Sequence, residues 1–377
     1  MRYDYIFSGF GLSGMMILHK MMAADLHLNK SILIIEPEDK SENDKTWSFW
    51  EKNQGNWDFL LSKSWDEAYF LGDGIKTNCM KNGYRYKSIA SDLFYKTIFK
   101  KIEGCKGIVW KKEKTLFFQE QNDTVIVKTN EATYEGATLF NSFYNRNEII
   151  NNAKYPLLQQ HFVGWFVKSK TPFFKENTAT FMDFTIDQQG NTRFLYVLPF
   201  SSTEALVEYT LFSPELLTQT EYEEGIQDYL KKIGLHEYSI TATEQGNIPM
   251  TVYPFWKKNS KRVLNIGTAG GWTKASTGYT FRNSDKLSEK VVDLLREKSF
   301  DFTNFKVFNR FTFYDKLLVR VLFDNNELGK SIFSSMFSKV SPDKIFRFLD
   351  EESSLQDELQ VILSCPKLPF IKALFKS

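Results

Sequence analysis

The sequence predicts a mixed α/β fold in which a parallel-sheet domain is interrupted by a β-rich segment and followed by helices. Three observations predict it. The first 36 residues have the pattern of a strand, a helix and a strand, another buried strand returns at Arg262–Gly267, and the tail from residue 300 is mostly helical. We therefore expect a discontinuous domain at 1–150 and 256–300, an inserted β-rich substrate domain at 151–255, and a helical region at 301–377.

A glycine-rich turn follows the first predicted strand and opens the first helix. Gly9, Gly11 and Gly14 have the G-x-G-x-x-G spacing. In a Rossmann-type unit the first glycine makes the tight turn, the second admits a pyrophosphate at the helix N-terminus, and the third lets the helix pack on the strand. Glu36 stands about 20 residues later at a strand end, where an acid can bind a ribose diol. The pattern predicts a dinucleotide site, with a tight turn in an ordinary α/β fold as the alternative.

A second glycine-rich segment, Gly267–Phe281, follows the returning strand. Its small residues let the backbone approach a flat or charged ligand where a Cβ would collide. A late strand, a glycine-rich turn and a helix start are what an FAD-binding fold needs near the ribityl chain and the ring. FAD is therefore favoured over NAD, and a glycine-rich loop in a core is the alternative. Besides the first loop, we expect FAD to contact Gly267, Thr268, Thr277, Gly278 and Tyr279.

One predicted strand, Ala205–Phe212, carries a carboxylate and has no solvated face. Glu208 shares its face with Leu206, Thr210 and Phe212. In an apolar cavity the pKa of this carboxyl would rise, which suits a general acid near neutral pH. A carboxyl exposed by local curvature is the alternative. Asp183 is a second candidate acid, with an ordinary strand-end carboxylate as its alternative.

Composition excludes several functional classes. The 48 basic and 46 acidic residues nearly cancel, so nothing favours nucleic acid. The three cysteines are scattered and the four histidines lack metal-ligand spacing, so we expect neither a disulfide framework nor a metal. The 16% aromatic content indicates a large apolar cavity, a membrane contact or a Phe-rich core. Without a signal segment or an apolar run of about 18 residues, we expect a cytoplasmic protein that can rest on a membrane.

The remaining elements are expected as follows. Residues 41–88 read as loop-like and rich in tryptophan, 91–101 as a helix, and 107–141 as strands. A helix is expected at 221–233, and strands at Gln160–Lys168, Thr178–Phe184, Thr192–Leu198 and Ala205–Phe212. The apolar face of residues 328–337, with lysines nearby, has the composition of an interfacial helix, and packing onto the folded body is the alternative.

Several longer segments occur in a recognisable order. After the first glycine loop and Glu36 come Asp44–Trp50, His161–Trp165, Phe181–Asp183, Phe194–Phe200, Leu206–Thr210, Gly246–Met250 and Gly267–Phe281. Together they resemble the lycopene cyclase family, the flavin-dependent carotenoid cyclases, over roughly residues 1–300. The Thr-Trp-Ser-Phe, Leu-Val-Glu-x-Thr and Ser-Thr-Gly-Tyr elements are more specific than the glycine loop.

The resemblance places the family's essential acid on Glu208. Many members carry a second acid directly after it, where this chain has Tyr209. Many also have proline at the position of Ala275, and many flavoproteins have a ribityl-binding aspartate where this chain has Thr268. The first departure puts in doubt a mechanism that needs two adjacent carboxylates.

The resemblance implies a lycopene beta-cyclase, an isomerase of the intramolecular lyase class in carotenoid biosynthesis. The reaction would be a redox-neutral, acid-catalysed closure of the linear ends of lycopene to β-ionone rings, with reduced FAD required and NAD(P)H as electron donor. Electron-rich rings can stabilise a carbocation by about 0.5–2 kcal/mol each. The rings expected around it are Trp47, Phe49, Trp50, Trp165, Trp272 and Phe281, together with Tyr279.

The implied substrate partitions into membranes, so we expect peripheral contact with the inner face of the cell membrane and with other carotenoid enzymes. Two rival interpretations remain. An FAD-dependent monooxygenase or isoprenoid reductase would have the same fold and would transfer electrons to oxygen or to its substrate. A non-enzymatic flavin-binding or membrane-docking protein is the other.

Overall fold

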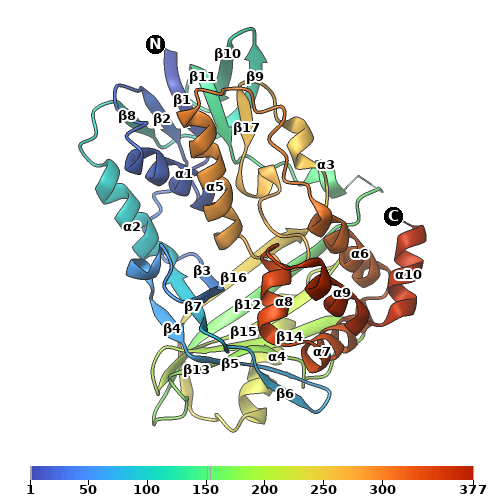
Figure 1. Ribbon diagram of the computed structural model, residues 1–377. Coiled ribbons are helices and arrows are strands. Elements are labelled where there is room, and N and C mark those ends of the chain that lie inside the picture. The colour runs from blue at the N-terminus through green and yellow to red at the C-terminus, as the bar shows by residue number, and fades with distance from the viewer. Residues whose placement is uncertain (1, 151, 153, 377) are drawn as a thin grey trace.

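The computed structural model describes residues 2–150, 152 and 154–376, and it contains two large sheets (Figure 1). The first sheet has seven strands and a parallel core. That core consists of β8 (Ile108–Lys111), β2 (Ile32–Ile35), β1 (Arg2–Ser8), β11 (Thr133–Asn141) and β17 (Val263–Asn265). The antiparallel strands β10 (Thr124–Thr129) and β9 (Thr115–Gln121) continue from β11. The pairing of β17 with β11 confirms that the late strand completes the sheet begun at the N-terminus.

Both faces of the first sheet are covered, so its central strands are buried on both sides. Tyr5, Phe7, Ile32 and Ile34 face a core shared with the helices α1 (Leu12–Ala23), α2 (Ser91–Ile102) and α5 (Phe281–Arg296). The alternate side chains of β1 and β2 pack with β10 and β17 in a second core. This arrangement explains the continuous apolar run of β2, which is typical of parallel strands.

The second sheet also has seven strands, in the order β16-β12-β15-β14-β13-β5-β6. These are β16 (Tyr238–Met250), β12 (Leu158–Ser169), β15 (Glu204–Ser213), β14 (Thr192–Pro199), β13 (Thr178–Asp183), β5 (Glu67–Gly72) and β6 (Ile75–Asn78). The helix α4 (Gln219–Lys232) covers one face. The other face packs against the C-terminal helices and the first half of the chain. The four strands expected in this region are confirmed, and β16 is an additional long strand.

The expectation of a loop-like segment at residues 41–88 is wrong. It contains β3 (Thr46–Lys52), β4 (Lys63–Trp65) and β7 (Tyr84–Ala90), which form a small sheet, the short helix η1 (Asp58–Leu60), and the strands β5 and β6 of the second sheet. The apolar alternation of β7 is obscured because Lys87 is buried. Its Nζ forms ion pairs with Glu51 at 2.9 Å and Asp58 at 2.6 Å.

The C-terminal region is helical, as predicted. It comprises α6 (Arg310–Asp324), η4 (Asn326–Leu328), α7 (Gly329–Lys339), α8 (Pro342–Leu349), α9 (Leu355–Ser364) and α10 (Lys367–Phe375). The apolar face of α7 packs onto the body, where Phe337 stacks on Phe70 at 4.5 Å and Phe333 on Phe184 at 5.6 Å between ring centres. The apolar face of residues 328–337 therefore packs onto the folded body, which was the alternative interpretation, and α7 is not an interfacial helix. Three further short helices are α3 (Asn147–Ile150), η2 (Phe255–Lys258) and η3 (Gly267–Gly270).

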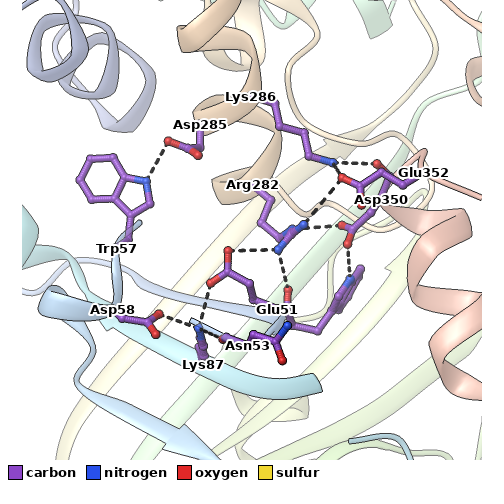
Figure 2. A network of polar contacts seen from close by, with 11 residues as sticks. Glu51, Asn53, Trp57, Asp58, Lys87, Arg282, Asp285, Lys286, Asp350 and Glu352 are labelled. Atoms are coloured by element: carbon purple, nitrogen blue, oxygen red, sulfur yellow. Dashed lines mark hydrogen bonds and ion pairs between the residues drawn. The ribbon is translucent and has the colours of Figure 1, made fainter. Parts of the chain in front are cut away.

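A polar network fixes the N-terminal end of α5 to the small sheet and to the C-terminal helices (Figure 2). Arg282 pairs with Glu51 at 3.3 Å and with Asp350, which ends α8, at 3.2 Å. The indole of Trp50 donates to the other oxygen of Asp350 at 3.0 Å. Because Glu51 also binds Lys87, these contacts hold three separate parts of the chain together. None of the described helices is long and apolar enough to cross a membrane.

Candidate functional site

A cavity of about 610 Å³ lies where the carboxyl ends of the parallel strands face the second sheet, and we call it the large cavity. Both glycine-rich segments reach it. Its lining includes Gly11, Gly14, Gly267, Thr268, Thr277, Gly278 and Tyr279 from those segments. From the second sheet it includes Gln160, Phe162, Tyr196, Leu206, Glu208 and Glu244. Residues separated by most of the chain therefore meet around one space at the carboxyl ends of the strands, where open α/β sheets bind ligands.

The first glycine loop leaves the N-terminus of α1 open towards this space. Gly9 has φ +79°, and a Cβ there would overlap with Ser142. A Cβ at Gly11 would meet nothing within 4 Å. The first turn of α1 has neither a side-chain cap nor an acidic residue, so its N–H groups are free to bind an anion. The loop therefore fits a pyrophosphate.

Glu36 is buried at the end of β2 and supports the same loop. Its Oε2 accepts the backbone N–H of Phe10 at 2.7 Å, and Lys40 lies 3.7 Å from its Oε1. The carboxylate keeps further acceptor sites. It is not one of the residues that line the large cavity, so ribose binding by Glu36 stays a prediction.

The second glycine segment is held as a tight turn beside the second sheet. Gly278 has φ +70° and its N–H donates to the carbonyl of Lys274 at 2.8 Å. The buried ammonium of Lys274 pairs with Asp315 at 3.0 Å and Glu351 at 3.1 Å, which anchors the turn to the C-terminal helices. A Cβ at Gly278 would overlap with the amide oxygen of Gln160, which is buried and has no hydrogen-bond partner within the protein. The cavity thus offers close backbone approach and an unused polar atom, both of which suit the flat, polar ring of a flavin.

Glu208 lies on the large-cavity face of β15, as its alternation predicts. Its Oε1 accepts the hydroxyl of Thr210 at 2.6 Å. Burial, followed by the charge of Glu244, raises the pKa of Glu208 to about 8. The carboxyl therefore holds its proton at neutral pH and can donate it.

Glu244 of β16 is a site residue that the sequence reasoning missed. It hydrogen-bonds to Glu208, and its Oε2 accepts the hydroxyl of Thr46 at 2.7 Å. Burial raises the pKa of Glu244 to about 7. No local signal marks this residue, because its position depends on the pairing of β16 with β12. A second carboxyl thus lies beside Glu208 and comes from another strand, whereas Tyr209 points to the α4 side of the sheet.

Three tyrosines line the large cavity with Glu208, and two of them also line a second, apolar cavity of about 380 Å³. The hydroxyls of Tyr86 and Tyr279 are 3.5 Å apart, and Tyr196 hydrogen-bonds to Tyr279. Burial raises the pKa of all three phenols, so they remain neutral. Tyr196 and Tyr279 line both cavities. The apolar cavity is otherwise enclosed by aromatic and aliphatic side chains of the second sheet and of the C-terminal helices α6 to α10.

The structure divides the six predicted cavity aromatics into three pairs. Trp47 and Phe281 line the large cavity. Phe49 and Trp50 lie behind it, with Phe49 stacked on Phe281 at 4.7 Å and Trp50 against Tyr279 at 4.5 Å between ring centres. Trp165 and Trp272 do not belong to the site, which corrects the prediction. Trp165 packs on the α4 side of the sheet, and Trp272 is fully buried in the core of the first domain.

Asp183 is also placed away from Glu208, which corrects its prediction as an acid. It pairs with Leu195, whose side chain belongs to the α4 side of the sheet. Its Oδ2 accepts the hydroxyl of Tyr229 at 2.9 Å, and its Oδ1 accepts from Thr185. Asp183 therefore fixes a strand end to α4. Among the described residues, no group of three or more His, Cys, Asp or Glu could hold a metal ion.

The sheet arrangement and the cavity define the chain as a protein with the fold of FAD-binding flavoenzymes. A geranylgeranyl bacteriochlorophyll reductase-like protein from Thermoplasma acidophilum has a TM-score of 0.63 at 12% identity, covering 100% of this chain and 99% of its own. A variant of halogenase PltM in complex with FAD has 0.57 at 12%, covering 98% and 87%. The flavin-dependent brominase Bmp2 has 0.57 at 14%, covering 100% and 99%. At these identities the likeness shows the fold alone.

The family described as "Lycopene cyclase protein" matches residues 4–375, and the chain belongs to this family. This confirms the resemblance. The lycopene beta-cyclase of Pantoea ananas is 27% identical over 209 residues, which are 51% of this chain and 53% of the relative. That of Paracoccus sp. (strain N81106 / MBIC 01143) is 25% identical over 224 residues, which are 56% and 57%. The chain thus spans about half the length of the curated relatives it matches.

The raised pKa values predict how stability changes with pH. In the folded chain Glu208 and Glu244 keep their protons to about pH 8 and about pH 7, whereas both ionise near the ordinary 4.5 when unfolded. Their contribution to stability is complete below about pH 4.5 and is lost as the pH rises to about 8. The free energy of unfolding of Glu208→Gln should therefore rise relative to that of the wild type as the pH goes from about 5 to 8. The expected gain is a few kcal/mol, on the order of the free energy that corresponds to the pKa shift of Glu208. Urea unfolding of both chains measures this difference, and a difference that stays constant with pH would contradict the assignment.

Proposed function

We propose that this chain is a lycopene beta-cyclase that closes the linear ends of lycopene to β-ionone rings by a redox-neutral, acid-catalysed reaction, as an isomerase of the intramolecular lyase class. One observation supports this most strongly. The buried Glu208 keeps its proton at neutral pH and lines a cavity that shares Tyr196, Thr277 and Tyr279 with an apolar cavity. A hydrocarbon substrate needs an apolar space and a protonated acid beside it, and this site offers both.

In the proposed mechanism Glu208 donates its proton to the terminal double bond of the polyene. A new C–H bond forms, and the resulting cation is attacked by a neighbouring double bond, which closes a six-membered ring. Loss of a proton from a carbon next to the new cation then forms the ring double bond. One proton enters and one leaves, so the reaction is an isomerisation without net electron transfer. Thr210 orients Glu208 through its hydroxyl.

The cation must be kept from water, and the walls of the site serve that purpose. Trp47 and Phe281 line the large cavity, and Tyr86, Tyr196 and Tyr279 close its end towards the apolar cavity. Their ring faces can stabilise a cation by about 0.5–2 kcal/mol each. The stacked Phe49 and the adjacent Trp50 hold Phe281 and Tyr279 in place.

The residues of the large cavity fit FAD. The free N–H groups at the start of α1, behind Gly11 and Gly14, would hold the pyrophosphate. The backbone of Gly267, Thr268 and Thr277–Tyr279 would hold the ribityl chain and the ring. When bound and reduced, FAD supplies negative charge beside the cation, with NAD(P)H as the electron donor.

The apolar cavity would hold the polyene, and its outer part is formed by the last two helices. α9 and α10 contribute Ile362, Leu363, Ile371 and Leu374 to its lining, and these four side chains are also exposed. Leu355, Leu359, Leu368 and Phe375 are further exposed apolar residues, and α10 carries Lys367 and Lys372, with Lys376 directly after it. This surface would rest on the inner face of the cell membrane, so that lycopene passes from the bilayer into the cavity.

An FAD-dependent monooxygenase or isoprenoid reductase remains the second candidate, because the similar structures include a reductase-like protein and p-nitrophenol 4-monooxygenase PnpA. Anaerobic incubation with reduced FAD and lycopene separates the two. A cyclase closes rings without stoichiometric consumption of the electron donor. An oxygenated or saturated product would refute the proposal.

The first prediction from this mechanism concerns the acid. Glu208→Gln keeps the shape of the side chain but cannot protonate a double bond, so cyclisation should fall by about 10²-fold or more. Glu204→Gln, at the half-buried start of the same strand, is the matched control and should retain activity. Pigment analysis in a lycopene-accumulating host measures both. Near wild-type ring formation by Glu208→Gln would show that another group is the acid.

The second prediction concerns the cofactor. Gly11→Val should leave the unfolding free energy nearly unchanged, because its Cβ meets open space and the backbone φ of −82° suits any residue. The added side chain would occupy the place of the pyrophosphate, so FAD should bind at least about 10-fold more weakly. Calorimetric titration with FAD measures this. Unchanged affinity would mean that the pyrophosphate lies elsewhere.

The third prediction concerns the membrane. Leu368 and Phe375 are 72% and 89% exposed, and replacing both with glutamate should weaken binding to vesicles of anionic phospholipid at least about 10-fold. The matched control replaces Leu116 and Phe117, which are 52% and 56% exposed on β9, with glutamate. Vesicle co-sedimentation measures both variants. Equal losses in the two would contradict docking through α9 and α10.

A further inference from the structure

We infer that Glu244 is a second acidic residue of the site, which contacts Glu208 across a gap that Gly164 leaves in the sheet. It keeps the proton on Glu208 before ring closure and helps Glu208 to recover a proton afterwards. The inference rests on the proposed function and assigns a positioning role to a residue of β16. Its basis is the register of three neighbouring strands.

The strand β12 lies between β15 and β16, and Gly164 of β12 is opposite Glu208 on one side and opposite Glu244 on the other. Residues directly opposite each other in antiparallel strands project from the same face of the sheet. The two glutamates therefore stand on one face, one strand apart on either side of Gly164. Any larger residue on the central strand would separate them.

The space above Gly164 shows why glycine is needed there. A Cβ at this position would lie 2.8 Å from Leu206 Cδ1, 3.2 Å from Glu244 Cγ and 3.4 Å from Glu208 Cβ. Both glutamate side chains thus lean over the glycine and meet in a hydrogen bond. Because Gly164 has no side chain, it leaves space on β12 in which the two glutamates can meet.

One oxygen of each carboxyl is oriented by a hydroxyl, which comes from the same strand for Glu208 and from β3 for Glu244. Thr210 of β15 donates to Glu208 at 2.6 Å, and Thr46 of β3 donates to Glu244 at 2.7 Å. Each carboxyl keeps a second oxygen, and the two side chains hydrogen-bond to each other. Two carboxyl groups this close favour a state in which one proton is held between them.

The surrounding charges are consistent with a singly protonated pair. The titratable groups around the large cavity are Lys40, Asp44, Lys45, Tyr86, Tyr95, Tyr196 and Tyr279. The tyrosines stay neutral, because burial raises the pKa of each. Lys45 is the cation that favours the charged form of Glu244. The protonated form is therefore favoured on Glu208 and the charged form on Glu244.

This arrangement closes the proton cycle of the proposed reaction. Glu208 gives its proton to the polyene, and both carboxylates are then charged beside the cation. The pair is now a strong base. When the C–H bond next to the cation breaks, its electrons form the ring double bond and its proton returns to the pair. No proton needs to enter from water during ring closure.

The experiment measures the Glu208 titration directly, by ¹³C NMR of the glutamate carboxyl carbons in the full chain without flavin or substrate. In Glu244→Gln the pKa of Glu208 should fall by about one unit or more, because a charge that favours its protonated form is gone. Gly164→Ala should shift it in the same direction by separating the two groups. Gly136→Ala in β11, where a Cβ would press only on the end of Ile6, is the matched control and should not shift it.

The same variants are then assayed for the pH dependence of cyclisation. The alkaline limb of kcat/KM should move to lower pH in Glu244→Gln and Gly164→Ala. An equal loss of activity at every pH, or an unchanged Glu208 titration, would overturn the role of Glu244 even if the wild type cyclises lycopene. A wild-type chain that shows the coupled titration but forms no rings would overturn the proposed function and, with it, the catalytic role of the pair.

Discussion

A carboxyl group that is buried and still protonated at neutral pH is the constraint on which the site depends. An isolated charge on Glu208 would be costly in its surroundings, so the group stays neutral and retains a proton that an exposed glutamate would lose. The rest of the molecule maintains this burial. The second sheet supplies the wall that carries Glu208, the turn at Gly278 lies against Gln160 beside it, and the tyrosines close the end towards the apolar cavity.

The walls of the cavity come from distant parts of the chain, so their relative positions must be fixed by long-range contacts. Arg282 and Asp350 connect the start of α5 to the C-terminal helices (Figure 2). Lys274 connects the second glycine turn to Asp315 of α6. Breaking a buried pair leaves a charge without its partner, which costs about 3–5 kcal/mol in other proteins. These networks therefore hold the walls of the cavity in fixed relative positions, and a catalytic site tolerates little displacement of its residues.

Local patterns in the sequence were sufficient to predict the parallel sheet, the two glycine turns and the burial of Glu208. Each of these depends on the residues within one or two elements. The placement of Trp165 and Asp183 was not predictable in this way, because it depends on strand register. Trp165 is opposite Val207, one residue away from the Gly164–Glu208 pair, and a step of one residue moves a side chain to the other face of a sheet. Glu244 was missed for the same reason, since only the pairing of β16 with β12 brings it to Glu208.

Cyclisation in heavy water under anaerobic conditions, with FAD kept reduced, tests whether a buried carboxyl drives a redox-neutral ring closure. The proton on Glu208 exchanges with solvent between turnovers, so we expect one deuterium atom in each ring formed and no net oxidation of the flavin. Rings without deuterium, or oxidation of one flavin per ring, would contradict it.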